Sequence, residues 1–306
     1  MDLPLKKSME KYILLTPVKK TAIWGSESWL IAAHENGDTL IQNGAWKGKT
    51  LGWLWRNHRE YFADMAGERF PLLIKEIIAE SDLSIQVHPN NEYAQEHEQG
   101  ASGKNECWYI LDAKPNASLI MGHNAKNKVE AENYIQHGQW NEFLKEVPVN
   151  PGDFYQIDAG CIHSIKGGIR LLEVQQNSDI TYRLYDYDRL DQYGRKRPLH
   201  LKKSLDVITF KDTKIQVPST QNLEFGTKTV FVETPYYHVE KYDIIEGEVL
   251  LDCQAPFLCI SILDGAGFLD SLPLVKGMSL LLPHQCQELT IKGNISFLLA
   301  FPPYSN

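Results

Sequence analysis

One β unit occurs twice in this chain, and the fold must accommodate both copies. The first copy, PGDFYQIDAGCIHSI, begins with a turn at Gly152, continues through a strand and a second turn, and ends at His163. The second copy, KGMSLLLPHQCQEL, begins at Gly277 and has Glu288 where the first copy has its histidine. This repeat predicts a duplicated β-barrel in which only the first copy carries a functional site.

Glycine and proline residues divide the rest of the chain into short β-type runs, which outnumber the helical patterns. Examples are YILLT, LLIKEIIA, ECWYIL, IRLLEVQQN, FLCISIL and ISFLLAF, so we expect a mostly β protein. A helical pattern over 129–147 predicts a helical insertion between strands. The polar segment Lys211–Lys228 has little periodicity, so we expect a first domain over 1–212 and a second over 224–306.

Composition excludes several classes of protein. The formal net charge of -8 argues against binding to nucleic-acid phosphates, but it leaves room for a local basic pocket that binds a small anion. No apolar run approaches the roughly 20 residues of a membrane-spanning helix, and charged residues interrupt the N-terminal apolar stretch that a signal peptide would need. The five cysteines include no C-x-x-C pair, which favours free thiols. We expect a cytoplasmic monomer or small homo-oligomer.

The stretch LSIQVHP carries a glutamine and a histidine in a β-type run. Because side chains alternate between the two faces of a strand, Gln86 and His88 share a face with Ser84, and Ile85 and Val87 share the other. We expect the apolar face to pack beneath a helix or a second sheet. A lone histidine in a strand is more often structural than a metal ligand.

Two further residues favour a metal site. Glu106 stands at the start of the run ECWYIL, and the turn of the repeated unit leads to His163. Together with Gln86 and His88 they make a set of nitrogen and oxygen ligands that suits zinc or a similar divalent ion. Spacing alone supports the metal site and a structural role about equally.

Several motifs together carry a resemblance to a known family. The frame from Gly152 to His163 is similar to the second signature of the cupin superfamily, with Asp158 where proline is more common. The runs IWGSESWLIAAHENG, SIQVHPNNEYA, GKNECWYI and EVQQNSDITYRLYDYDR closely resemble type I mannose-6-phosphate isomerases in their short bacterial form. The resemblance implies two cupin-type (jelly-roll) barrels, of which the first is catalytic and the second degenerate.

The resemblance also implies a cofactor and a reaction. It assigns one zinc ion per chain to Gln86, His88, Glu106 and His163. It implies the interconversion of mannose 6-phosphate and fructose 6-phosphate through a cis-enediol, so that the partner is a small sugar phosphate. This chemistry needs a base near neutral pKa and a cation where the enediolate oxygen develops charge.

Three other residues take roles from the same resemblance. Arg183 matches the active-site arginine of the family, although by itself it would be interpreted as part of a surface salt bridge. Lys104 becomes an expected substrate contact, and Glu173 a candidate acid–base group that would equally well hold Arg183 or a ligand in place. Some relatives have a catalytic histidine directly before the lysine, but Gly103 stands there in this chain, so that role is not carried over.

Two alternatives to this isomerase remain at the level of sequence. Another metal-dependent cupin enzyme, such as a dioxygenase, would usually show a tighter H-x-H cluster, whereas Gln86 replaces the first histidine here. A non-catalytic sugar-binding cupin would have no reason to retain Lys104, Glu173 and Arg183 beside all four ligands. The sequence contains no P-loop and does not assign the residues that bind the phosphate.

Overall fold

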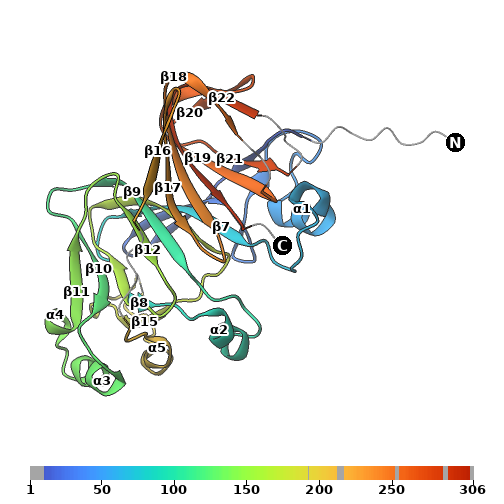
Figure 1. The fold of residues 1–306 in the computed structure, drawn as a ribbon. Helices are drawn as coiled ribbons and strands as arrows, with labels where there is room; N and C mark the ends of the chain where they lie inside the picture. The colour runs from blue at the N-terminus through green and yellow to red at the C-terminus, as the bar shows by residue number, and fades with distance from the viewer. Residues whose placement is uncertain (1–9, 192, 212–216, 252–254, 285–288, 304–306) are drawn as a thin grey trace. The chain divides into compact units, whose positions relative to one another are not determined.

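The computed structural model describes residues 10–191, 193–211, 217–251, 255–284 and 289–303. Figure 1 shows a chain built mainly of β-strands with a few short helices, which confirms the expected mostly β class. Within the described part, none of the helices has the length and apolar character that crossing a membrane requires.

The strands are, in chain order, β1 (Ile13–Thr16), β2 (Val18–Ala22), β3 (Gly25–Ile31), β4 (Ala33–His34), β5 (Gly37–Asp38), β6 (Leu40–Ile41), β7 (Leu72–Ala79), β8 (Ile85–Val87), β9 (Glu106–Ala113), β10 (Ser118–His123), β11 (Leu144–Pro148), β12 (Phe154–Ile157), β13 (His163–Ile165), β14 (Ile169–Gln176), β15 (Tyr182–Tyr185), β16 (Ser219–Leu223), β17 (Gly226–Glu233), β18 (His238–Leu251), β19 (Phe257–Leu269), β20 (Leu272–Val275), β21 (Ser279–Pro283) and β22 (Leu289–Phe301). The helices are α1 (Leu51–Asn57), the 3₁₀ helix η1 (Arg59–Phe62), α2 (Asn91–His97), α3 (Lys128–Gln136), α4 (Trp140–Phe143) and α5 (Leu201–Val207).

The chain divides into two compact units, each of which draws on separate segments. The central unit contains Lys19–Trp29 and Leu73–Gln216, and the terminal unit contains Met1–Val18, Leu30–Leu72 and Val217–Asn306. The division after Gln216 falls in the polar segment that the sequence singled out. The expected domains over 1–212 and 224–306 were continuous, however, whereas the units are not, because β1 pairs with β21 and therefore belongs to the terminal unit.

The central unit contains two sheets with a shared core. A five-stranded sheet has the order β11-β10-β13-β8-β15, and a six-stranded sheet has the order β12-β9-β14-β7-β3-β2. One buried cluster contains Leu119 and Ile165 from the first sheet together with Ile110 and Leu171 from the second. The two sheets therefore face each other across this cluster, as in a sandwich or barrel.

The outer face of the five-stranded sheet is covered by helices. Ile85 and Val87 of β8 are buried in a second cluster with Ala131 of α3 and Phe143 of α4. Figure 1 shows α3, α4 and α5 gathered near β8, β15, β10 and β11. The expected packing of Ile85 and Val87 beneath a helix is confirmed, and because strand side chains alternate, Gln86 faces the other sheet.

The helical insertion expected over 129–147 is only partly correct. The side chain of Asn127 accepts a hydrogen bond from the backbone of Glu130 and caps α3, and α4 follows as a single short turn. The prediction is wrong from Leu144 onward, where the chain forms β11. There Val147 pairs with Leu119 of β10, and this ladder outweighs the helical pattern of the sequence.

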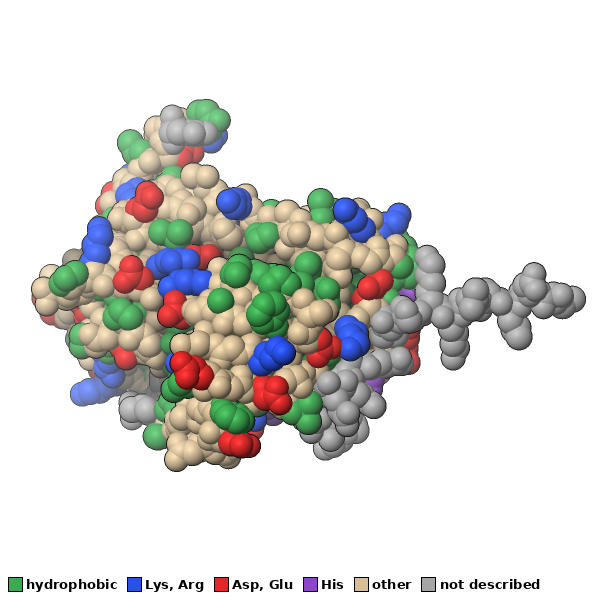
Figure 2. All heavy atoms as spheres, turned by 90° about the horizontal axis from the view of Figure 1, so that it is seen from above, with side chains coloured by type: hydrophobic (Ala, Val, Ile, Leu, Met, Phe, Trp, Pro, Cys, Tyr) green, Lys and Arg blue, Asp and Glu red, His purple; other side chains and the backbone are tan. Residues whose placement is uncertain are grey.

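The terminal unit contains a nine-stranded sheet with the order β16-β17-β18-β22-β19-β21-β1-β6, and β20 pairs with β19. The second copy of the repeated unit forms β21, whose Leu280 and Leu282 are buried in a core of leucine, isoleucine and aromatic side chains. Glu288 of that copy lies outside the described residues. On the face drawn in Figure 2, acidic and basic side chains are interspersed with uncharged ones rather than gathered into one basic surface.

Candidate metal centre

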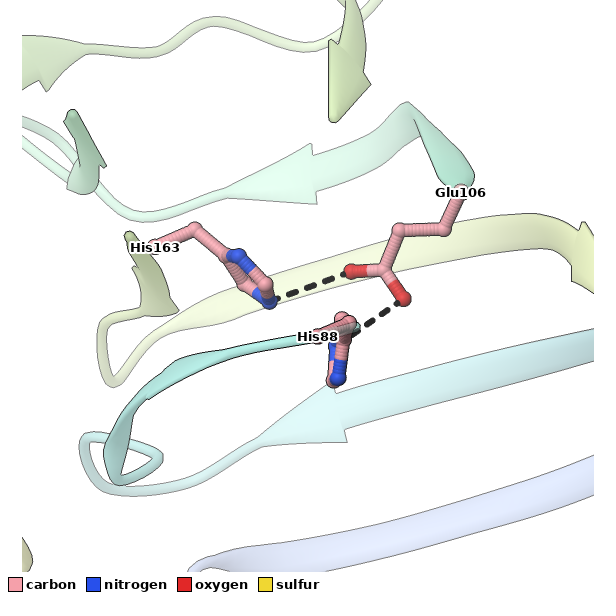
Figure 3. Close-up of side chains that lie close together, drawn as sticks. All are labelled: His88, Glu106 and His163. Atoms are coloured by element: carbon pink, nitrogen blue, oxygen red, sulfur yellow. Dashed lines mark ion pairs between the residues drawn. The ribbon is translucent and has the colours of Figure 1, made fainter. Parts of the chain in front are cut away.

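Three strands of the central unit bring a carboxylate and two imidazoles together. Glu106 begins β9, His163 begins β13 and His88 directly follows β8, and all three side chains are buried with their ligand atoms within 4.8 Å of one another. Figure 3 shows both rings beside the carboxylate. His163 Nε2 lies 3.3 Å from Glu106 Oε1, and His88 Nε2 lies 3.5 Å from Glu106 Oε2.

Backbone carbonyl groups fix both imidazoles in the form that binds a metal. The Nδ1 atom of His88 lies 2.7 Å from the carbonyl oxygen of Ile180, and that of His163 lies 2.9 Å from the carbonyl oxygen of Cys161. A carbonyl oxygen only accepts hydrogen bonds, so Nδ1 donates in each ring and Nε2 keeps its lone pair. The buried Nε2 of His88 has no hydrogen-bond partner among the described residues, as expected of a metal ligand.

The electrostatics of the cluster also fit a divalent cation. Burial, and then the positive charge of Lys104, hold the pKa of His88 well below its usual value. Burial likewise lowers the pKa of His163 to about 4, so both rings are neutral at pH 7. Burial, followed by the nearby Glu173, raises the pKa of Glu106 to about 7. A bound cation would favour the ionised form of this carboxylate further, in addition to the ammonium of Lys104.

Gln86 lies beside this cluster on the inner face of β8. It pairs directly with His163 of β13 on one side and with Arg183 of β15 on the other, so the three side chains form one row across the sheet. Gln86 Nε2 lies 3.3 Å from His163 Nε2, and Oε1 accepts a hydrogen bond from Ser84. The amide of Gln86 therefore borders the cluster, and its role as a ligand stays a prediction.

Lys104 and Glu173 belong to a chain of buried charges that adjoins the cluster. Lys104 Nζ lies 2.7 Å from Glu106 Oε2 and 3.9 Å from Glu173 Oε1. Glu173 also accepts a hydrogen bond from Trp108 Nε1 at 3.1 Å. Burial by itself would raise the pKa of Glu173, but Lys104 and Lys75 outweigh it and lower the pKa. An ionised, paired Glu173 suits a positioning role better than that of a proton donor near pH 7.

Lys75 is a member of this chain that the sequence reasoning missed. It lies in β7, only 6% exposed, with Nζ 3.2 Å from Glu173 Oε1 and 3.7 Å from Glu27 Oε2. In the sequence it appeared only as part of the strand LLIKEIIA. A lysine inside an otherwise apolar run was the available signal, because buried charges in proteins are almost always paired.

We expect the substitution Lys75→Met to destabilise the protein by about 2 kcal/mol, because it leaves Glu173 with only the more distant Lys104 as a cationic partner. Urea unfolding of the parent and the variant measures this difference. The double variant Lys75→Met, Glu173→Gln should recover part of the loss, since it removes the uncompensated carboxylate. An unchanged free energy of unfolding in Lys75→Met would contradict the structural importance of the pair.

A cavity of about 290 Å³ lies next to the metal cluster in the central unit. Its lining includes Gln86, Lys104, Glu173 and Arg183, so the structure brings these predicted residues to one cavity. The Nε of Arg183 is buried without a hydrogen-bond partner, and no described carboxylate forms an ion pair with its guanidinium. A surface salt bridge, the alternative interpretation of Arg183, is therefore not what the structure shows.

Comparisons with known proteins agree with this arrangement. Residues 10–120 match the family model described as phosphomannose isomerase type I, catalytic domain. Residues 227–302 match the model described as mannose-6-phosphate isomerase, cupin domain, which confirms the expected cupin fold of the second repeat region.

Individual relatives are similar over nearly the whole chain. Mannose-6-phosphate isomerase ManA of Bacillus subtilis (strain 168) is 43% identical over 309 residues, covering 92% of this chain and 96% of the relative. Mannose-6-phosphate isomerase of Streptococcus mutans is 42% identical, covering 89% of this chain and 87% of the relative. The crystal structure of the mannose 6-phosphate isomerase from Bacillus subtilis superposes with a TM-score of 0.92 at 40% identity and covers 95% of this chain and 99% of that one. The chain therefore belongs to the type I phosphomannose isomerase family.

Proposed function

We propose that this protein is a zinc-dependent aldose–ketose isomerase that interconverts D-mannose 6-phosphate and D-fructose 6-phosphate. The observation that carries the proposal is the cluster of His88, Glu106 and His163, which adjoins a cavity lined by Lys104 and Arg183. The relatives from Bacillus subtilis and Streptococcus mutans named above support the choice of substrate.

The isomerisation moves one proton between C1 and C2 through a cis-enediol, and negative charge develops on the neighbouring oxygens. Zinc held by His88, Glu106 and His163, with Gln86 as a fourth ligand, would polarise and orient the substrate oxygens. We propose one such ion per chain.

The side chains of the cavity have separate tasks in this reaction. Arg183 presents a guanidinium without a carboxylate partner, which stabilises the developing enediolate charge. Lys104 is buried, but Glu106 and Glu173 outweigh the effect of burial and raise its pKa, so its ammonium remains charged and donates hydrogen bonds to a substrate oxygen. Glu106 at 2.7 Å and Glu173 at 3.9 Å hold this ammonium in place.

We expect chelation to abolish isomerase activity and added zinc to restore it, because both histidines and Glu106 are arranged around a common centre. A coupled assay of fructose 6-phosphate formation from mannose 6-phosphate, before and after dialysis against a chelator, measures this. Magnesium, which prefers all-oxygen octahedral sites, serves as the control and should restore little. Full activity in a sample shown by metal analysis to be metal-free would refute the metal-dependent mechanism.

A further inference from the structure

Lys20 is a cation of the cavity that neither the metal cluster nor the proposed chemistry uses. It lies in β2, where Lys19 and Thr21 are exposed and Lys20 is half-buried against the cavity. β2 ends the strand order of the six-stranded sheet, and β15, which carries Arg183, ends that of the five-stranded sheet. Lys20 and Arg183 thus contribute to the cavity from the edge strands of the two facing sheets.

The ammonium of Lys20 is held in place without a carboxylate. Its Nζ lies 3.3 Å from the centroid of the Trp29 ring, and Trp29 is only 2% exposed. A cation–π contact of this kind fixes the charge, and the N–H donors that point away from the ring remain available. No described carboxylate forms an ion pair with Lys20, whereas Lys75 and Lys104 both have such partners. Burial lowers the pKa of Lys20, although the negative charges of Glu27 and Asp179 act against this effect.

Carboxylates do not neutralise all of the cations that line the cavity. Five cations and three carboxylates line it, namely Lys20, Lys75, Lys104, Arg183 and Arg197 against Glu27, Glu173 and Asp179. Arg197 is already bound by Asp186 through two hydrogen bonds of 2.7 and 2.6 Å. Lys20 and Arg183 are thus the cations of this lining without an ion pair among the described residues. A phosphate monoester carries a charge of about −1.5 to −2 at pH 7, and Lys20 is the unpaired cation of this lining that the proposed chemistry does not use.

We propose that Lys20 binds the phosphate group of the substrate and sets the preference of the site for phosphorylated over unphosphorylated sugars. The proposal rests on the proposed function for the identity of the sugar, but the anion chemistry follows from the cavity itself. A lysine binds phosphate as a compact point charge, and the Trp29 ring holds this one in position before the anion arrives.

The variants Lys20→Met and Lys19→Met test the proposal, because they remove the same charge from opposite faces of one strand. Lys20→Met should raise the KM for mannose 6-phosphate by about 10- to 100-fold, the effect of losing one charge-assisted contact, while kcat changes less than about threefold. Metal content should be unchanged, because Lys20 is not among the converging ligand atoms. Lys19→Met should behave as the parent, and Lys20→Arg should retain most of the affinity.

Inorganic phosphate separates this proposal from the proposed function. Calorimetric titration of the intact protein should show phosphate binding that Lys20→Met weakens about tenfold or more and Lys19→Met leaves alone. If that pattern appears in a protein that does not isomerise mannose 6-phosphate, the isomerase assignment is wrong and the role of Lys20 stands. Equal phosphate binding in Lys20→Met and the parent, equal effects of the two methionine variants, or an equal loss of activity on mannose and mannose 6-phosphate would overturn the role of Lys20.

Discussion

Replacing His163 with alanine should reduce the zinc content from about one ion per chain to below about a tenth, and isomerase activity should fall with it. The side chain is buried, and Nε2 is one of the converging ligand atoms beside Glu106. Without it, His88 and Glu106 remain with only an amide as a third donor, which is too weak a set to retain zinc through purification. Metal analysis after dialysis and the coupled isomerase assay measure the two losses.

Two controls make the His163→Ala result specific. Glu106→Gln keeps the size of the side chain and should also release the metal, which guards against a variant that merely fails to fold. His284→Ala removes an imidazole of the terminal unit whose Nδ1 contacts the carbonyl oxygen of Ala255, and its zinc content should equal that of the parent. A full equivalent of zinc in His163→Ala, or two ions per parent chain, would show that the metal lies elsewhere.

The terminal unit gives little reason to expect a second metal. Among the described residues, His88, Glu106 and His163 are the only group of three or more histidine, cysteine or acidic side chains close enough together to hold a metal ion. Instead, the side chains of Leu280 and Leu282, in the strand of the second repeat, are buried in an apolar core. Glu288, which stands in the second copy where the first copy has His163, lies outside the described residues.

The parts of the site that the sequence predicted are those fixed by local geometry. Because successive side chains of a strand point to opposite faces, Gln86 lies on the face away from Ile85 and Val87 wherever the strand packs. The turn that contains Gly160, where φ is +87°, likewise leads into the strand that His163 begins. Both features are settled within a few residues, so a single sequence is enough to predict them.

The parts that the sequence missed depend on partners in other strands. Lys75 is stabilised in its buried strand by Glu173, and Lys20 is held by Trp29 of another strand. Glu173 stays a candidate acid–base group, although the lower pKa that Lys104 and Lys75 cause favours a positioning role. The last residues of the expected helical insertion formed β11 for the same reason, because β10 offered a ladder that local propensity does not reveal.

Replacing Arg183 with alanine should lower kcat by about 10²-fold or more, the effect of removing one group that stabilises transition-state charge. Arg183 pairs with Gln86 in the sheet, so its side chain shares the inner face with a predicted ligand of the metal. Its charge has no carboxylate partner among the described residues, and it is available to an oxyanion that forms only during the reaction. Zinc content should be unchanged, because a guanidinium does not bind the metal.

Arg197 provides the matched comparison. It lines the same cavity, but its guanidinium already donates two hydrogen bonds to the carboxylate of Asp186. Arg197→Ala should therefore affect stability more than kcat, whereas Arg183→Ala should affect kcat more than stability. The kinetic parameters also separate the two residues: Arg183→Ala is expected to lower kcat, whereas Lys20→Met is expected to raise KM. Near-normal kcat in Arg183→Ala would contradict charge stabilisation, and loss of zinc from that variant would mean that the residue supports the metal site instead.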